Sequence, residues 1–335
     1  MNLHKDSKLF KQAIQFASDQ MQILPIYVEK DYWVTFALFQ ILQAPIGKDV
    51  IFKGGTALSK CYKLIERFSE DIDLVVLRRE NETDSKLKTK LKDISNAVIK
   101  DLPEIDIEGI TRKMGMNRKT AHSYNKIFTG EYGQVRDIII LESSWLGYYE
   151  PYNKQIINSF IGEILDKNGQ TKNIQNYGLQ PFEMNVLEPS RTICEKIMSL
   201  VRFSYTETPI QDLKNKIRHT YDIHQLIEQK EFKDFLDSED FIDMLLKVAN
   251  DDVNSFRNNN DWLNNHPNDS LFFKSLDSIW KNELQEVYKN EFKNLVYGEL
   301  PNENKILKSL QYIKERMTNI KWNIDVKRIT KNTSI

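Results

Sequence analysis

Two aspartates separated by a single residue are the first candidates for chemistry in this chain. Asp71 and Asp73 alternate with the apolar residues Ile72 and Leu74. On a β-strand this alternation turns both carboxylates to one face and both apolar side chains to the other. The carboxylates would then be about 6.6 Å apart and, at an effective dielectric constant near 20, would repel each other by about 2.5 kcal/mol. A cation relieves this repulsion, and carboxylate oxygens suit Mg²⁺ that also binds substrate phosphates.

A double glycine precedes these aspartates. Gly54, Gly55 and Thr56 follow the short apolar run at 50–52, which predicts a strand that ends in a sharp turn. Thr56 is expected to begin a helix over 57–67, whose free N–H groups would suit a phosphate. A double glycine or a D-x-D alone is common in proteins without a catalytic role. Joined through a helix, they predict a site for a nucleoside triphosphate and metal ions.

Composition limits the class of protein. Glycine (12) and proline (9) are scarce among the 335 residues, at about half their usual share, which predicts long helices. The net charge of −1 excludes a uniformly basic coat, so contact with nucleic acid would need a local patch. The two cysteines, Cys61 and Cys194, provide neither a disulfide framework nor a four-ligand zinc site, which suits a reducing cytoplasm. We find no signal peptide and no apolar run long enough for a membrane helix, and we expect a cytoplasmic location.

Hydrophobic periodicity divides the chain into an α/β half and a helical half. In the first half it predicts helices over 9–21, 29–42, 57–67 and 78–100, and strands over 50–52, 72–77, 135–141 and 182–187. In the second half it predicts helices only, over 190–204, 211–229, 231–249, 270–296 and 303–318. The expected domains are therefore 1–188 and 189–335.

The motifs resemble those of a known superfamily. G-G, a helix and then D-x-D on a strand is similar to the signature of nucleotidyltransferases with a DNA polymerase β-like fold. The spacer of 14 residues between Thr56 and Asp71 and the sequences K-G-G-T-x-L-S-K and R-F-S-E-D-I-D-L resemble the AbiEii-type nucleotidyltransferase toxins. Glu29-Lys-Asp-Tyr-Trp33 and Arg218-His-Thr-Tyr-Asp-Ile-His224 resemble the same family. The resemblance implies an α+β fold: a polymerase β-like domain with a mixed sheet and helices over 1–188, then a C-terminal helical bundle over 189–335.

The resemblance also implies a third metal-binding acid on a strand next to that of Asp71 and Asp73. Glu142 follows the predicted strand at 135–141 and is our candidate, both as a metal ligand and as a general base. Asp137, on the opposite face of that strand, is the rival. An acid exposed to solvent just beyond a strand end is an equally good interpretation of Glu142.

Two residues of the helical half correspond to a lysine and an aspartate that contribute to the active site in this family, Lys196 and Asp222. Lys196 borders an apolar stripe and therefore needs an anion, such as a triphosphate, or a route for its ammonium to water. Arg218 could contact a phosphate or pair with Asp222 at i,i+4. Gly54, Gly55 and Thr56 are expected to bind the nucleotide as well. Lys60 is expected to join them on a rim of the site, together with Lys63 and Arg67.

The segment 111–126 carries five basic residues and no acid. Its basic residues are Arg112, Lys113, Arg118, Lys119 and Lys126, with aromatic residues at Tyr124 and Phe128. Basic residues among aromatics suit single-stranded nucleic acid, although a solvated hairpin explains the pattern equally well. We interpret it as an RNA contact.

These expectations combine into one hypothesis. The protein uses Mg²⁺ or Mn²⁺ to move an NMP from an NTP to an acceptor, with tRNA as the best candidate. By resemblance it is the toxin of a bacterial toxin–antitoxin or phage abortive-infection pair with a cognate antitoxin. The alternatives are a nucleotide- or RNA-binding module with a degenerate site, and nucleotidylation of a protein, either itself or a partner. Aspartate-based phosphatases also use D-x-D, but they lack the upstream G-G-T.

Overall fold

The structure is a computed structural model that describes residues 1–69, 71–113, 115–130, 135–147, 149–256 and 259–326. The chain forms two compact units, which are described separately. The first comprises Met1–Trp145, Pro151–Leu187 and Leu295–Gly298. The second comprises Leu146–Glu150, Glu188–Asn294 and Glu299–Ile335.

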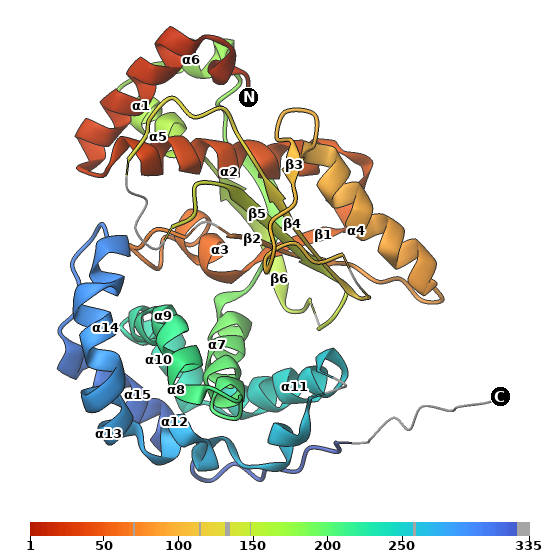
Figure 1. The fold of residues 1–335 in the computed structure, drawn as a ribbon, viewed down its shortest axis with the longest axis vertical. Coiled ribbons are helices and arrows are strands. Elements are labelled where there is room, and N and C mark those ends of the chain that lie inside the picture. Colours follow the sequence, from red (N-terminus) through yellow and green to blue (C-terminus); the bar gives the residue numbers. More distant parts are fainter. Residues whose placement is uncertain (70, 114, 131–134, 148, 257–258, 327–335) are drawn as a thin grey trace. The chain divides into compact units, whose positions relative to one another are not determined.

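A mixed sheet is the centre of the first unit (Figure 1). Within the described residues it has seven strands in the order β3-β4-β5-β2-β1-β7-β6. They are β1 (Val50–Lys53), β2 (Asp71–Val76), β3 (Glu104–Ile105), β4 (Asn117–His122), β5 (Ile139–Ser144), β6 (Tyr152–Ile157) and β7 (Phe182–Leu187). The β2–β5 and β1–β7 pairs are parallel, and the other pairs are antiparallel.

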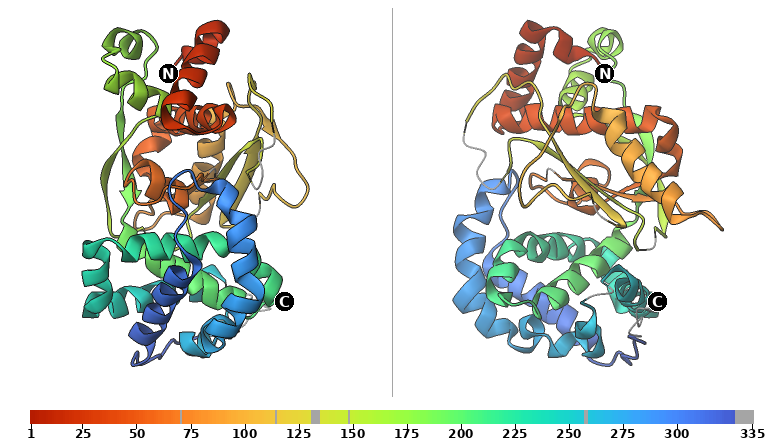
Figure 2. Two further views of the ribbon diagram at one scale, coloured as in Figure 1. Left: turned by 90° about the vertical axis from the view of Figure 1, so that its left-hand side faces the viewer. Right: turned by 45° about the vertical axis from the view of Figure 1, so that its right-hand side comes forward.

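Helices cover one face of this sheet. The helices of the unit are α1 (Ser7–Met21), α2 (Pro25–Gln43), α3 (Gly54–Lys60), α4 (Asp84–Val98), α5 (Phe160–Lys167) and α6 (Thr171–Asn176). Figures 1 and 2 show α2 crossing the sheet, with α4 beside it. Ile72 and Leu74 of β2 and Leu141 of β5 belong to the apolar core under these helices. The alternation in β2 therefore turns Asp71 and Asp73 to the opposite face of the sheet.

Helix α2 is buried nearly all round, and its buried residues include charged ones. The Glu29 carboxylate accepts hydrogen bonds from the backbone N–H groups of Ile127 (2.7 Å) and Phe128 (2.9 Å). The Lys30 ammonium donates to the backbone carbonyl of Arg136. These buried charges pair with backbone groups, as the cost of burying an unpaired charge requires. They fix two chain segments about a hundred residues away against α2.

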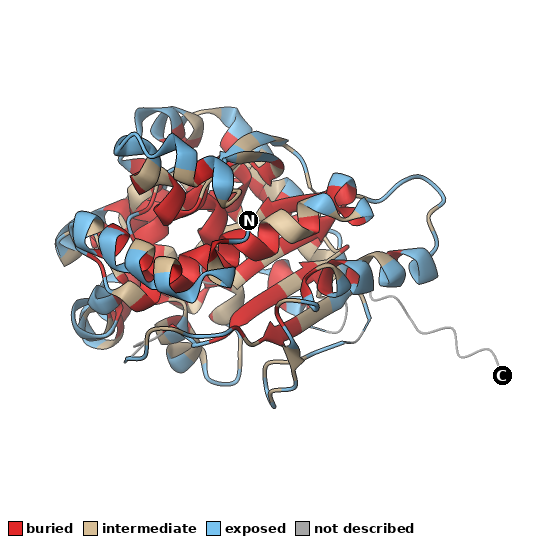
Figure 3. Cartoon of the chain, turned by 90° about the horizontal axis from the view of Figure 1, so that it is seen from above, coloured by how far each residue is buried: buried red, intermediate tan, exposed pale blue. Residues whose placement is uncertain are grey.

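The second unit is helical. Its helices are α7 (Pro189–Phe203), α8 (Pro209–Asn215), α9 (Ile217–Ile227), α10 (Lys230–Asp237), α11 (Glu239–Ser255), α12 (Leu271–Lys274), α13 (Leu276–Ile279), α14 (Gln285–Asn290) and α15 (Glu303–Met317). Buried residues run through the helices and the sheet strands, and exposed residues lie on their outer faces (Figure 3). No helix in the described part of the chain is long and apolar enough to cross a membrane.

Several predicted elements have different bounds. The helix predicted over 57–67 ends at Lys60, and Lys63 then adopts a left-handed backbone with φ 55°. The strand predicted over 135–141 begins at Ile139 and continues to Ser144, so Glu142 lies within it. The helix predicted over 270–296 is divided into α12, α13, a π-helical turn and α14. The predicted fold class, a mixed sheet with helices followed by a helical region, is confirmed.

Candidate active site

Four charged residues form one row across four neighbouring strands. The sheet register pairs Lys53 of β1 with Asp73 of β2, and Asp73 with Glu142 of β5. Glu142 in turn lies opposite Lys119 of β4. Residues opposite each other in neighbouring strands point to the same face of a sheet. Asp71, two residues before Asp73, shares this face, so three carboxylates and two lysines gather on the side of the sheet away from the main core.

The negative charge of this row is only partly balanced by its lysines. Burial and, after it, the nearby carboxylates of Glu142 and Asp71 together raise the pKa of Asp73 to about 7, against the opposing effect of Lys53 and Lys119. Among the described residues, the buried Oδ1 of Asp71 has no hydrogen-bond partner. A buried oxygen without a donor is costly, and a divalent cation removes that cost together with the repulsion. The residues present therefore fit a hard cation.

The third candidate acid, Glu142, is paired with a lysine. Glu142 Oε2 accepts from the Lys119 ammonium at 2.8 Å. Within the described residues no cluster of three or more potential metal ligands is already formed. Asp137, the rival candidate, precedes β5 and pairs with Lys126. Glu142 is thus the candidate that adjoins Asp73 in the sheet, with its carboxylate held by a lysine.

The double glycine brings the backbone close to these carboxylates. Gly54 has φ +81°, and a Cβ at this position would lie 2.2 Å from Asp73 Oδ2. A Cβ at Gly55 would lie 2.7 Å from Arg67 Nη2 and 3.0 Å from Ser69 Oγ. Gly54 requires glycine for space and for its backbone conformation, whereas a side chain at Gly55 would displace the end of the Arg67 side chain.

We expect Gly54→Ala to lower activity severely and the free energy of unfolding by about 2 to 4 kcal/mol, because it combines left-handed strain with displacement of Asp73. Gly109→Ala is a matched control: its φ is +78°, but nothing lies within 4 Å of its added Cβ. Urea denaturation and transfer assays of both variants measure the difference. Equal losses in the two variants would show that the close approach to Asp73 is unimportant.

Thr56 has a structural contact where the sequence suggested a nucleotide ligand. Its buried hydroxyl donates to the backbone carbonyl of Asp71 at 2.6 Å and lies 3.0 Å from Ser69 Oγ. This contact ties the beginning of α3 to the beginning of β2. It therefore helps to set the spacing between the glycine turn and the D-x-D strand.

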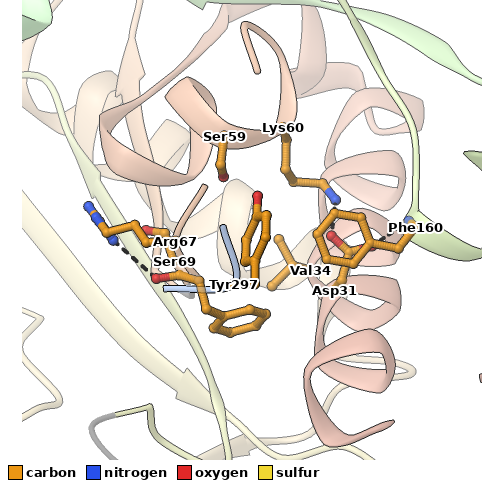
Figure 4. A pocket seen from close by; sticks show the side chains of 9 residues that line it. Asp31, Val34, Ser59, Lys60, Arg67, Ser69, Phe160 and Tyr297 are labelled. Atoms are coloured by element: carbon orange, nitrogen blue, oxygen red, sulfur yellow. Dashed lines mark hydrogen bonds and ion pairs between the residues drawn. The ribbon is translucent and has the colours of Figure 1, made fainter. Parts of the chain in front are cut away.

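Lys60 does not lie on a surface rim, so that expectation was wrong. Its ammonium pairs with Asp31 Oδ1 at 2.5 Å, and both side chains are only 4% exposed. The second oxygen of Asp31 accepts from the backbone N–H of Phe160 at 2.7 Å. Figure 4 shows this pair in a small cavity that Arg67 and Tyr297 also line. Lys60 thus anchors the end of α3 to α2.

Tyr297 reaches this cavity from a segment distant in sequence. The backbone N–H of Tyr297 donates to the carbonyl of Glu66 at 3.0 Å, and that of Phe68 donates to the carbonyl of Leu295 at 2.7 Å. Arg67, predicted for the rim, is buried. Residues 66–68 immediately precede the D-x-D strand, so the segment 295–298 supports the approach to that strand.

In the helical unit the two predicted site residues meet each other. Lys196 Nζ of α7 lies 2.6 Å from Asp222 Oδ2 of α9, with side chains 7% and 0% exposed. The Asp222 carboxylate is therefore the anion that we expect beside Lys196. Arg218 lies one turn before Asp222 in α9 and is half-buried. Asp71, Asp73 and Glu142 belong to the first unit, and this buried pair belongs to the second.

The basic segment is largely paired with acids. Lys113 and Arg118 both contact Glu104, and Lys119 and Lys126 form the ion pairs with Glu142 and Asp137 described above. Arg112 is exposed. Part of the segment is strand β4, which adds Lys119 to the row of charges beside Asp73.

Sequence reasoning missed the roles of Asp31 and Lys53. Both lie inside motifs that were recognised, E-K-D-Y-W and K-G-G-T, but neither motif reveals its partner. Asp31 is 29 residues from Lys60, and the β1–β2 register alone places Lys53 opposite Asp73.

The structure places D-x-D on an inner strand of a mixed sheet beside a glycine turn, the arrangement that the resemblance to nucleotidyltransferases implies. The profile of the family described as nucleotidyl transferase AbiEii toxin, type IV toxin–antitoxin system, matches residues 37–316. The chain belongs to this family, so it is a nucleotidyltransferase toxin of a type IV toxin–antitoxin system, as the motifs predicted.

The fold is similar to that of a solved nucleotidyltransferase toxin, MenT4 from Mycobacterium tuberculosis H37Rv. The TM-score is 0.52 at 14% identity, with 91% of this chain and 92% of that chain covered. At this identity the likeness concerns the fold alone. No curated protein matches the sequence significantly.

Proposed function

We propose that the protein transfers an NMP from an NTP to tRNA in a reaction that depends on Mg²⁺ or Mn²⁺ and releases pyrophosphate. The observation that carries the proposal is the Asp71 carboxylate. Its buried Oδ1 lacks a hydrogen-bond donor in the described structure, and Asp73 lies beside it against the glycine turn. A buried carboxylate oxygen without a donor is costly, and a bound divalent cation would remove that cost.

In this proposal Asp71 and Asp73 hold the divalent cation, and Glu142 joins them. The cation, when bound, would neutralise the triphosphate and help to align the attacking and leaving oxygens. The backbone at Gly54 and Gly55 lets the phosphates approach closely. Glu142 is also proposed to accept the proton of the attacking hydroxyl.

Further residues are proposed to act on the nucleotide through the family resemblance. Lys196 and Arg218 would contribute positive charge toward the phosphates, and Asp222 would orient Lys196. The contact of Asp222 with Lys196 supports this orienting role. Lys60 would act indirectly, because its ammonium is already paired with Asp31.

The proposed acceptor is RNA, bound by the basic segment at 111–126. The exposed guanidinium of Arg112 and the partly exposed Lys113 support this assignment. The other basic residues would have to leave their acidic partners in order to bind RNA phosphates. Breaking surface ion pairs costs little. Such binding would weaken as the salt concentration rises.

The test uses purified protein, Mg²⁺, each of the four NTPs labelled at the α-phosphate, and total bacterial tRNA. Wild-type protein is expected to label tRNA, and the double variant Asp71→Ala/Asp73→Ala is expected to leave it unlabelled. Label on the protein itself would replace tRNA by a protein acceptor. Absence of label from tRNA and protein, with bound NTP, would overturn the tRNA assignment.

A further inference from the structure

Lys119 contacts the candidate active site in a way that its RNA-binding interpretation does not explain. Its ammonium lies 2.8 Å from Glu142 Oε2, at one end of the row that continues to Asp73. The negative charges of Glu142, Asp71 and Asp73 all act on this ammonium. Lys119 is thus a cation already present at the carboxylate face.

The ion pair between Lys119 and Glu142 is solvent-exposed enough to separate at little cost. The Lys119 side chain is 29% exposed and that of Glu142 is 46% exposed. Ion pairs with this much solvent contact contribute only about 0 to 1 kcal/mol. Both side chains are in contact with solvent, in contrast to the enclosed pair of Lys60 with Asp31.

We propose that Lys119 is a positioning residue that stands in for the metal: in the metal-free protein its ammonium partly neutralises the carboxylate face and holds the carboxylate of Glu142. Binding of a divalent cation then exchanges the partner of Glu142 from Lys119 to the cation. This inference rests on the proposed function, because it requires a cation site at Asp71 and Asp73.

The exchange has a measurable cost. Lys119 repels an incoming divalent cation and competes with it for Glu142, so the lysine weakens cation binding. Removing one charge near a divalent cation in a solvated site should tighten the dissociation constant by about three- to tenfold. The same removal leaves the metal-free acids less compensated, so a bound cation should then raise the melting temperature by more than it does in wild type.

The chain offers a matched control on the same sheet. Lys154 of β6 lies opposite Asn185 of β7 and pairs diagonally with Glu183 of β7 at 3.7 Å, with side chains 73% and 62% exposed. Like the pair of Lys119 and Glu142, it joins a lysine and a glutamate of neighbouring strands, but it lies outside the row with Asp73. Lys154→Met therefore tests for the general effect of losing a lysine from the sheet.

The experiment measures Mn²⁺ binding by electron paramagnetic resonance, with Mg²⁺ as competitor, and melting temperatures with EDTA or Mn²⁺. Lys119→Met is expected to bind Mn²⁺ three- to tenfold more tightly and to show the larger Mn²⁺-induced rise in melting temperature. Lys119→Arg, which keeps the charge, and Lys154→Met are expected to stay within twofold of wild type. Unchanged or weaker binding by Lys119→Met overturns the inference.

A further variant separates this inference from the proposed function. Asp71→Asn/Asp73→Asn should remove the Mn²⁺ site, with or without Lys119→Met. Binding that persists in the double variant means that the proposed metal site itself is wrong. Binding that is lost in the double variant, with no tightening in Lys119→Met, rejects the role of Lys119 alone.

Discussion

Asp71→Asn/Asp73→Asn is expected to reduce nucleotidyl transfer by at least about a thousandfold, because several kcal/mol of transition-state stabilisation depend on the cation that these carboxylates hold. The same variant should raise the free energy of unfolding in EDTA by about 1 to 2 kcal/mol. It removes repulsion between carboxylates that the lysines of the row only partly balance in the metal-free fold. The transfer rate and urea denaturation in EDTA measure the two effects.

Asp137→Asn is the control for this result. Asp137 is an exposed acid that pairs with Lys126 and lies outside the row beside Asp73. We expect transfer by Asp137→Asn within about threefold of wild type and a change in stability below about 1 kcal/mol. Loss of stability in the double asparagine variant, with retained transfer, would mean that the two aspartates serve the fold and not the reaction.

Lys196→Met is expected to lower the free energy of unfolding by about 3 to 5 kcal/mol. It leaves the Asp222 carboxylate, which is 0% exposed, without the ammonium now 2.6 Å away. The double variant Lys196→Met/Asp222→Leu removes both charges and should recover most of that loss, since apolar replacements of buried pairs are often neutral. Urea denaturation of the wild type and the three variants, including Asp222→Leu, completes the cycle.

The transfer activity of these variants then shows whether Lys196 and Asp222 serve the fold alone or also the reaction. If Lys196 acts on the nucleotide, the stable double variant remains inactive. If the pair only supports the helices, the double variant regains transfer together with its stability. Lys214→Met provides the control: Lys214 pairs with Glu283 at 2.9 Å, with side chains 29% and 39% exposed, and its loss should cost less than about 1 kcal/mol.

The sequence predicted the elements that have strong periodic patterns. The alternation from Asp71 to Leu74 gave both the strand and the face of each side chain. It could not give β4, where only the last three residues of Asn117–His122 are buried, so no alternation marks the strand. Edge strand β6 is polar and largely exposed, so no alternation of apolar and polar residues marks it either. Lys63, in a left-handed conformation, ends the α3 region where apolar spacing favoured more helix.

Contacts between residues distant in sequence are the part of the site that could not be predicted. Glu142 could be chosen as an acid near a strand end, but its place beside Asp73 depends on the parallel register of β2 with β5. The sequence suggests surface cations at Lys60 and Lys119, because their partners, Asp31 and Glu142, are distant in sequence. Charge alone did not indicate which lysines would be neutralised.

The most direct test of the central claim follows the two ends of the triphosphate. Purified protein is incubated with tRNA, Mg²⁺ and the donor NTP labelled at the α-phosphate in one reaction and at the γ-phosphate in another. The account predicts α-label on the acceptor and γ-label in pyrophosphate. Both should disappear with EDTA and in Asp71→Asn/Asp73→Asn. Label from the γ-phosphate on the acceptor, or α-label transfer that persists without these carboxylates, would contradict it.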